Sequence, residues 1–215
     1  MGAPRVPSLD QVHLADVPLV PEVRLFLAAD AIILWARLEA AAGRSLPAPF
    51  WASAWPGGQA LARYILDHPA SVAGRTVLDV ASGSGLVAIA AAMAGARAVT
   101  ANDVDPYAIA AISANARANG VVLTPAVGDL LDGDGEGADV VLVGDALYDG
   151  PMAQRVVPFL TRAVGRGADV LLGDPDRQHL PTDRLRLVAT YQLTVTGPPE
   201  DAQIRRADVF TIQAD

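Results

Sequence analysis

From position 75 onward, short apolar runs alternate along the chain with longer stretches of helical periodicity. Runs rich in Val, Leu and Ala predict strands at 76–81, 98–103, 123–128, 139–147 and 169–174. Helical patterns follow at 86–95, 107–120 and 152–164. Strands that are apolar along their length and alternate with helices are typical of a parallel sheet covered on both faces. This part of the chain therefore predicts an α/β fold.

The end of the chain departs from this alternation. Two further predicted strands, 191–196 and 209–213, are joined only by a loop. That connection is too short for a parallel crossover, so the two strands are expected to pair antiparallel. The fold class is accordingly α/β, with a doubly wound, mostly parallel seven-stranded sheet and a C-terminal antiparallel hairpin.

The N-terminal part has a different pattern. Positions 1–20 contain several prolines and few periodic positions, which predicts an irregular arm. Pro21 before and Gly43 after a good helix-forming stretch predict a helix between them. A second helix is predicted at 58–68, ended by Pro69. The broad apolar face of the first helix is expected to include Leu25, Ile32, Ile33, Trp35 and Leu38.

These patterns predict one domain over 1–215. An N-terminal helical extension, with its arm and helices, occupies 1–70, and a Rossmann-like core occupies 75–215. A chain of 215 residues, 52% apolar and 19% charged, can bury one core of ordinary size and is not a disordered chain.

Composition narrows the location and the chemistry. No uninterrupted apolar stretch is long enough to span a membrane, and the start lacks an apolar signal core, so we expect a cytoplasmic protein without a membrane partner. The chain has no cysteine, which excludes disulfides, thiolate metal sites and cysteine nucleophiles. His13, His68 and His179 share no metal-ligand spacing, so no metal is expected.

The charge of −8 bears on possible partners. All 16 basic residues are Arg, and they are scattered, with Arg205 and Arg206 as the only adjacent pair. A nucleic-acid partner would need a concentrated basic surface, so none is expected. The acidic balance favours a neutral or basic partner.

The segment 77–90, VLDVASGSGLVAIA, carries the strongest indication of a ligand. Small residues from Ala81 through Ser82, Gly83 and Ser84 to Gly85 follow a strand and open a helix, an arrangement that lets backbone N–H groups approach a ligand. A tight turn without a ligand is the structural alternative. Gly83 and Gly85 also satisfy a dinucleotide fingerprint, which is weak on its own.

Two acids bear on which ligand this is. Asp103 closes the second strand, where a carboxylate can accept both ribose hydroxyls of an adenosine-containing ligand of either class. Asp79 lies inside the first strand, where dinucleotide sites usually hold apolar residues. A carboxylate at that position suits a ligand with a positively charged amino group, such as S-adenosylmethionine.

The D-x-x-x-G-x-G loop from Asp79 to Gly85, together with Asp103, Asp129 and the terminal hairpin, resembles the class I, seven-stranded S-adenosylmethionine-dependent methyltransferases. One departure is Ala81, which stands where that family usually has its first Gly. Since Ala fits a tight turn when φ stays negative, a positive φ is not expected at Ala81.

Within that class, the chain is similar to the family-16 protein lysine methyltransferases. Their motif after the fourth strand is D/E-x-x-F/Y, which here reads Asp145-Ala-Leu-Tyr148. The segments PLVPEVRLFLA, PFWASAW and GDPDRQHLP make it most similar to the bacterial electron transfer flavoprotein β-subunit lysine methyltransferases. This resemblance implies S-adenosyl-L-methionine as cofactor and a protein with an exposed lysine as partner.

The resemblance also implies roles for individual residues. The backbone of Ser82 and Gly83 would contact the methionine moiety, Asp103 the ribose, and Asp129 with Leu130 the adenine. Trp55 matches a cofactor-side Trp, with core packing as the alternative for Trp51 and Trp55.

Asp145 and Tyr148 are the candidate catalytic residues because they end the fourth strand beside the loop. Asp145 would orient the acceptor amine, Tyr148 would line the methyl-transfer channel, and the amine proton would leave to water. A capping Asp and a half-buried Tyr are the structural alternative.

Other functions stay open on the sequence alone. A small-molecule (nicotinamide-like) or ribosomal-protein N-methyltransferase would use the same loop on a different acceptor. A nicotinamide-dinucleotide oxidoreductase and a module that binds the cofactor without catalysis are further alternatives.

Overall fold

The computed structural model describes residues 12–135, 137–181, 184–193 and 206–212. Its main sheet has seven strands in the order β5-β4-β3-β6-β7-β9-β8. Strands β3 to β7 are parallel, whereas β9 pairs antiparallel with both β7 and β8. The predicted fold class is confirmed. The strand bounds are Thr76–Val80 (β3), Ala98–Asp103 (β4), Thr124–Val127 (β5), Val140–Gly144 (β6), Asp169–Asp174 (β7), Leu185–Gln192 (β8) and Arg206–Ile212 (β9).

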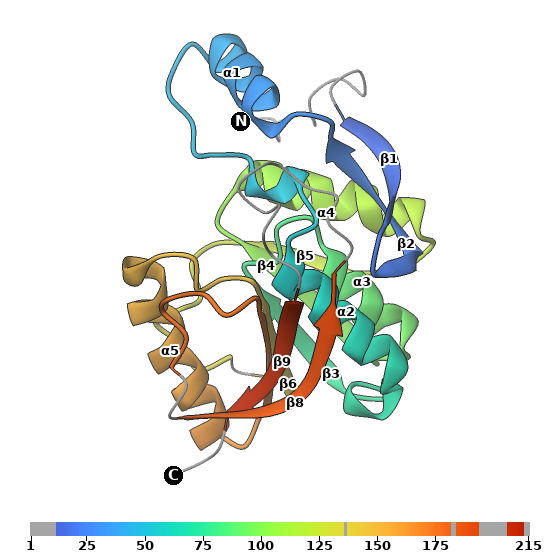
Figure 1. Cartoon of the computed structure of the whole chain (residues 1–215), viewed down its shortest axis with the longest axis vertical. Helices are drawn as coiled ribbons and strands as arrows, with labels where there is room; N and C mark the ends of the chain where they lie inside the picture. Colours follow the sequence, from blue (N-terminus) through green and yellow to red (C-terminus); the bar gives the residue numbers. More distant parts are fainter. Residues whose placement is uncertain (1–11, 136, 182–183, 194–205, 213–215) are drawn as a thin grey trace.

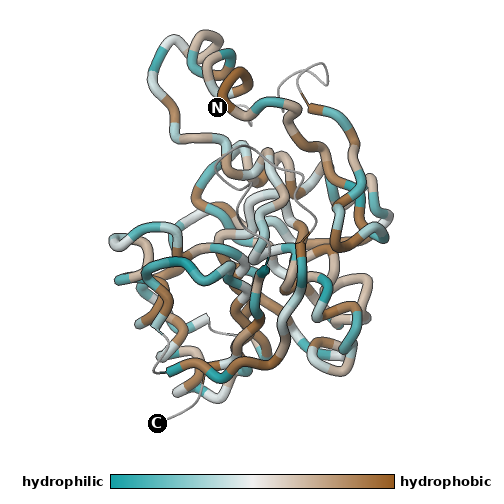
Figure 2. The backbone as a smooth tube through the Cα atoms, in the orientation of Figure 1, coloured by the Kyte–Doolittle hydropathy of each residue, from teal (hydrophilic) through white to brown (hydrophobic). Residues whose placement is uncertain are grey.

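Helices cover both faces of this sheet (Figure 1). One face carries α2 (Pro56–Asp67), α3 (Leu86–Met93) and α4 (Pro106–Ala118), and the other carries α5 (Gly150–Gly165). Residues of β6 alternate between the two cores: Val140 and Leu142 belong to the α2–α3 core, whereas Val141 and Val143 belong to the α5 core. Figure 2 shows apolar residues gathered along these central strands.

The N-terminal part contains a hairpin that the sequence did not predict. Strands β1 (Val12–Val17) and β2 (Val20–Ala28) pair antiparallel and lie beside α4 (Figure 1). The backbone N–H of Phe26 donates to Asn115 Oδ1 at 2.8 Å, which ties β2 to α4. The irregular arm expected over 1–20 is therefore wrong for 12–20, and 1–11 lie outside the described residues.

The single helix expected between Pro21 and Gly43 is also wrong in its first part. Val23 and Leu25 are buried while Glu22 and Arg24 are exposed, an alternation of period two that suits β2. Helix α1 begins only at Ala31 and ends at Ala42.

Asp30 and Gly43 set the two ends of α1. Asp30 Oδ1 accepts from the N–H groups of Ile32 and Ile33. Gly43 at φ +64 ends the helix as predicted. The predicted apolar face is wrong at Ile32 and Ile33, which are exposed, whereas Leu34 and Leu38 are the residues that α1 buries.

Two of the predicted strand boundaries also shift. β6 ends at Gly144 because Asp145 adopts a left-handed φ of +61°. β8 begins at Leu185, earlier than the strand predicted at 191–196. Residues 194–196 of that predicted strand, and residue 213 of the next one, lie outside the described residues.

Glycines let the start of α2 reach the carboxyl ends of two strands. A Cβ on Gly57 would overlap the backbone of Gly173 in β7, and one on Gly144 in β6 would overlap the backbone of Gly58. This close approach is possible only without side chains. It fixes the position of Trp55, which directly precedes α2.

Candidate active site

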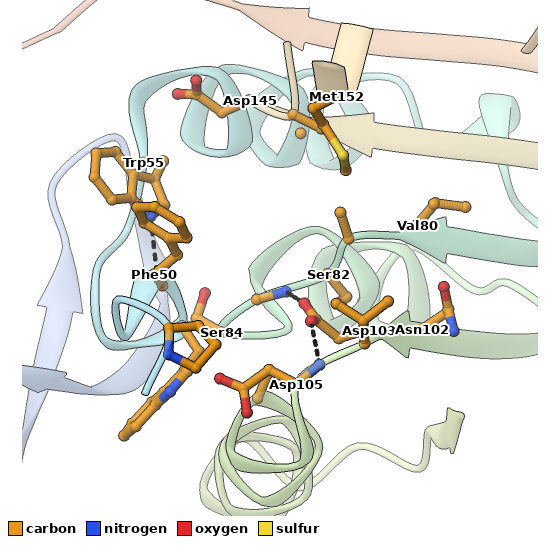
Figure 3. A pocket seen from close by; sticks show the side chains of 18 of the residues that line it. Phe50, Trp55, Val80, Ser82, Ser84, Asn102, Asp103, Asp105, Asp145 and Met152 are labelled. Atoms are coloured by element: carbon orange, nitrogen blue, oxygen red, sulfur yellow. Dashed lines mark hydrogen bonds between the residues drawn. The ribbon is translucent and has the colours of Figure 1, made fainter. Parts of the chain in front are cut away.

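A pocket of about 1070 Å³ lies over the carboxyl ends of the parallel strands (Figure 3). This is at the upper end of the range of about 300 to 1,000 Å³ for ligand sites, and it lies where open α/β sheets bind their ligands. Asp103 and Asp105 lie on one side of the pocket and Asp145 and Met152 on the other, with Phe50 and Trp55 at one end. The predicted site residues that line it are Trp55, Asp79, Ala81, Ser82, Gly83, Asp103, Asp129, Leu130, Asp145 and Tyr148.

The loop between β3 and α3 turns on three residues with positive φ. These are Ala81 at +53°, Gly83 at +54° and Gly85 at +84°. The expectation for Ala81 was wrong: it adopts the left-handed conformation that costs an L-residue about 1 to 2 kcal/mol. Gly85 does not line the pocket. It caps the start of α3 at a positive φ, and a side chain there would press on Ile112.

Asp79 is a buried acid at the base of this loop. Its Oδ2 accepts from the Ser82 hydroxyl and from the N–H of Ala88, at 3.1 Å for Ala88. Burial raises the pKa of Asp79 to about 7, a change opposed by these two hydrogen bonds. The described residues form no ion pair with Asp79 that would supply a positive charge, so a cationic ligand group would stabilise its ionised form.

Asp103 lies at the end of β4, on the same side of the pocket. Its Oδ2 accepts from the N–H of Gly83 at 2.9 Å, and its Oδ1 accepts from the N–H of Asp105 at 3.0 Å. Burial raises its pKa. A carboxylate that bonds the loop on one side and faces the pocket on the other can position a diol against that loop.

Asp129 and Leu130 follow β5, at the predicted adenine position. The Asp129 carboxylate forms an ion pair with Arg155 at 2.6 Å, and the hydrogen bond from Arg155 lowers its pKa. The Asp129 side chain is partly exposed beside the half-exposed Leu130. An adenine contact for this pair stays a prediction, and Arg155 is a partner that the sequence did not reveal.

Three aromatic rings gather at one end of the pocket. Phe50, in the short 3-10 helix Phe50–Ala52, lies 5.9 Å from Trp55 and 5.3 Å from Tyr148, measured between ring centroids. Trp55 Nε1 donates to the carbonyl of Phe50 at 2.8 Å (Figure 3). Trp51 is buried in the core with α1 and also lines the pocket, so the structure shows packing for this residue beside a place at the site.

Asp145 is buried and bound by two other residues of the protein, which the sequence did not predict. Its side chain is 1% exposed, and its two oxygens accept from the N–H of Gly57 at 2.8 Å and from Arg177 Nε. Its own N–H donates to the carbonyl of Gly173. The predicted contact with an acceptor amine stays a prediction.

Arg177 and Phe50 line the pocket without having been predicted as site residues. Arg177 follows β7, the neighbour of β6, and the two strands end side by side in register through Gly144 and Gly173. A basic residue after one strand and an acid after its neighbour could have suggested the pair, although the sequence alone leaves the loop conformation open.

Comparison with known proteins identifies the family. Three vertebrate electron transfer flavoprotein β-subunit lysine methyltransferases match most of the chain. The zebrafish (Danio rerio) protein is 39% identical over 78% of this chain and 65% of its own length. The mouse (Mus musculus) protein is 39% identical over 86% and 72%. The frog (Xenopus laevis) protein is 34% identical over 98% and 87%.

The chain belongs to this family of lysine methyltransferases. It is therefore an S-adenosylmethionine-dependent methyltransferase, as its glycine loop and the acid at the end of β4 indicate. The family model of ribosomal protein L11 methyltransferase also matches residues 60–145 of this methyltransferase, which hold the cofactor loop and end at Asp145.

Solved structures agree with the fold. A ribosomal protein L11 methylase from Lactobacillus delbrueckii subsp. bulgaricus has a TM-score of 0.54 at 21% identity, over 74% of this methyltransferase and 79% of that chain. A tRNA (uracil-54, C5)-methyltransferase from Pyrococcus abyssi, in complex with S-adenosyl-L-homocysteine, has a TM-score of 0.51 at 22% identity, over 71% and 38%. At these identities the likeness shows the fold alone.

The residues of the methyltransferase pocket fit its cofactor. S-adenosylmethionine carries a ribose diol and an amino group, and the pocket offers Asp103 for the diol and the buried Asp79 near the loop for the amine. In the described residues, no group of three or more His, Asp or Glu could hold a metal ion. No described helix is long and apolar enough to cross a membrane.

Proposed function

We propose that this enzyme transfers a methyl group from S-adenosylmethionine to the ε-amine of a lysine on an electron transfer flavoprotein β-subunit. The observation that carries the proposal is that one pocket joins two different sets of groups. Asp79 and Asp103 lie at the ends of β3 and β4, and the Asp145–Tyr148 motif lies after β6. The names of the similar proteins supply the acceptor.

On the cofactor side, Asp79 would face the amino group and Asp103 would accept the ribose hydroxyls. Asp129, held by Arg155, and Leu130 would lie along the adenine. When bound, the cofactor supplies a methyl group on a sulfonium, which reacts by in-line displacement. The protein's task is then mainly to hold the two reacting groups in line.

On the acceptor side, Tyr148 and Phe50 would line the channel through which the lysine side chain enters. Tyr148 is 44% exposed and packs against Phe50, so its ring can contact the aliphatic part of a lysine. Burial and nearby acids raise the pKa of the Tyr148 hydroxyl, so that it stays protonated at neutral pH and does not act as a base.

A lysine amine, with a reference pKa of about 10.4, must lose its proton before it can attack. We propose that this proton leaves to water. Asp145 would act on the acceptor indirectly: it binds both Gly57 and Arg177 and so fixes the wall of the pocket that the acceptor contacts. The expected cytoplasmic location stays a prediction from the sequence.

One alternative acceptor has support from a specific observation. The match of residues 60–145 to the ribosomal protein L11 methyltransferase family covers the cofactor loop. That stretch ends at Asp145 and leaves out Phe50, Tyr148 and Arg177, the other residues on the acceptor side. The alternative therefore rests on the half of the pocket that is shared by enzymes with different acceptors.

The test is a comparison of three acceptors with one enzyme preparation. Purified enzyme and labelled S-adenosylmethionine would be incubated with recombinant electron transfer flavoprotein β-subunit, ribosomal protein L11 or nicotinamide, and the methylated position located by peptide mass spectrometry. We expect label on a lysine of the flavoprotein subunit, lost in the Asp103→Ala enzyme. Label on ribosomal protein L11 or nicotinamide, with none on the flavoprotein subunit, would overturn the acceptor assignment.

A further inference from the structure

One wall of the pocket is formed by the residues that follow β6 and β7, and in this wall the charge of Asp145 is neutralised by Arg177. Arg177 Nε donates to Asp145 Oδ1, and the Arg177 side chain is 23% exposed where that of Asp145 is 1% exposed. Both residues line the pocket. A ligand on this side therefore meets the guanidinium before it meets the carboxylate.

The position of Arg177 is fixed from behind by a second acid. The backbone N–H of Arg177 donates to Asp174 Oδ1 at 2.6 Å. Asp174 is fully buried at the end of β7, and its Oδ2 has no hydrogen-bond partner among the described residues. Burial raises the pKa of Asp174 to about 6, and the nearby Asp145 adds to this change. Without Arg177, the neighbouring carboxylates of Asp145 and Asp174 would lack its positive charge.

This arrangement bears on the protonation of the acceptor. A lone carboxylate beside a lysine amine favours the ammonium form, which cannot attack the methyl group. A carboxylate already paired with a guanidinium exerts little net field, and the guanidinium itself disfavours a second positive charge nearby.

Other charged or titratable groups line the same pocket from the elements around it. Those from the N-terminal segment, the ends of β3 and β4 and the start of α4 are Arg44, Asp79, Asp103, Asp105 and Tyr107, and those from the loops after β5 and β6 and from α5 are Asp129, Tyr148 and Arg155. Asp149, Asp174, Asp176 and His179 lie on the neighbouring loops and strand ends and are not among the residues that line the pocket. Asp129 is paired with Arg155. The acids that line the pocket without an Arg or His ion pair among the described residues are Asp79, in β3, and Asp103 and Asp105, which lie on the side opposite Asp145 (Figure 3).

We propose that Arg177 is a positioning residue for methyl transfer: by pairing with Asp145 it keeps the acceptor side of the pocket from holding the lysine as an ammonium. This rests on the proposed function, because it assumes an amine acceptor. It adds a role for the GDPDR segment after β7, which the cofactor and the D-x-x-Y motif do not explain.

The pH dependence of kcat tests this inference, because kcat reports groups that ionise in the enzyme–substrate complex. The enzyme, Arg177→Gln and Arg177→Lys would be assayed from pH 6.5 to 10 at saturating cofactor and acceptor. For Arg177→Gln we expect the acid limb to move up by about one pH unit, which gives a loss of about tenfold at pH values below the parent's limb and a smaller loss as the pH rises through it. For Arg177→Lys, which keeps the positive charge, the limb should stay near its original place.

Thermal unfolding and cofactor affinity would show that the variants are folded. The double variant Asp145→Asn/Arg177→Gln, which removes both charges, should bring the limb back toward the parent position. An equal loss for Arg177→Gln at all pH values, with an unmoved limb, would overturn the inference and leave Arg177 with a structural role only. A parent enzyme that methylates no lysine at any pH would instead refute the proposed function.

Discussion

The acidic residues on the two sides of the pocket differ in whether an arginine neutralises them. On the cofactor side, Asp79 and Asp103 are held by backbone N–H groups and a hydroxyl, and no described Arg or His forms an ion pair with them. On the acceptor side, Asp145 is buried against Arg177. On the cofactor side, the acids stay available for the positively charged amino group of the cofactor. On the acceptor side, Arg177 neutralises Asp145, beside the place where the acceptor lysine must lose its charge.

Burial without a counter-charge also affects stability. Because the pKa of Asp79 is about 7 in the folded protein and near 4 when unfolded, the folded state binds more protons between these values. The free energy of unfolding of the ligand-free enzyme therefore falls as pH rises from about 4 to 7. The cofactor side thus loses stability at neutral pH in the absence of its ligand.

The largest expected effect is the loss of the cofactor in Asp103→Ala. Two ribose hydroxyls would lose a charged acceptor, at roughly 1.5 to 3 kcal/mol for each hydrogen bond, so Kd should rise by more than about 100-fold. Isothermal calorimetry with S-adenosylmethionine measures this, with Asp169→Ala as a control because Asp169 pairs with Arg75 outside the pocket. Normal binding by folded Asp103→Ala would remove the ribose assignment.

Next in size is the effect of Asp145 on transfer. In Asp145→Ala, Gly57 and Arg177 lose their common partner and the acceptor wall shifts, for which a loss of about 100-fold in kcat is reasonable. Cofactor Kd should stay within a few-fold, and Asp145→Asn, which suits the φ of +61°, should retain the fold. A parallel loss of cofactor affinity and turnover would place Asp145 on the cofactor side and contradict the division of the pocket into two sides.

A smaller effect is expected for Asp79→Asn, with opposite signs for stability and binding. The stability of the ligand-free variant relative to the parent should be greater at pH 8 than at pH 5 by about 2 to 3 kcal/mol, because over this range the folded parent loses the Asp79 proton while the unfolded parent is already mostly ionised. Cofactor affinity should fall about tenfold or more at pH 8. Thermal unfolding and calorimetry at both pH values check this; a variant whose stability relative to the parent does not rise from pH 5 to pH 8 would contradict it.

The smallest effect concerns the left-handed residue of the loop. Ala81→Gly should raise the free energy of unfolding by up to about 1 kcal/mol, because Gly adopts the φ of +53° without steric cost. Ala36→Gly, in the exposed middle of α1, is the matched control and should lower it by about the same amount. Equal destabilisation in chemical denaturation of both variants would mean that the loop does not strain Ala81.

What the sequence predicts well is local or repeats along the chain. The α/β alternation, the glycine loop and the acid at the end of β4 follow from short patterns, and the structure brings the loop and this acid to one edge of the sheet. One failure was also local. Pro21 and Gly43 punctuate a helix-like stretch, but it is divided into a strand and a helix by the capping of α1 by Asp30 and by the hydrogen bond that the Phe26 N–H of β2 donates to Asn115.

The pairing of Asp145 with Arg177 could not be predicted in the same way. The two residues are 32 positions apart, and their contact depends on the loop after β7 and on the glycines that admit α2. Burial, which sets the pKa of Asp79 and Asp174, likewise depends on packing from several elements at once. The sequence can identify such residues as candidates, but only the fold shows which residues they contact.

The most direct test of the contrast between the two sides is a crystal structure of the enzyme with S-adenosylhomocysteine. We expect the ribose hydroxyls within hydrogen-bond distance of Asp103, the ligand's amino group on the side of Asp79 and the loop, and Arg177 still paired with Asp145. A ligand whose ribose or amino group lies against Asp145, with Arg177 displaced, would contradict this expectation.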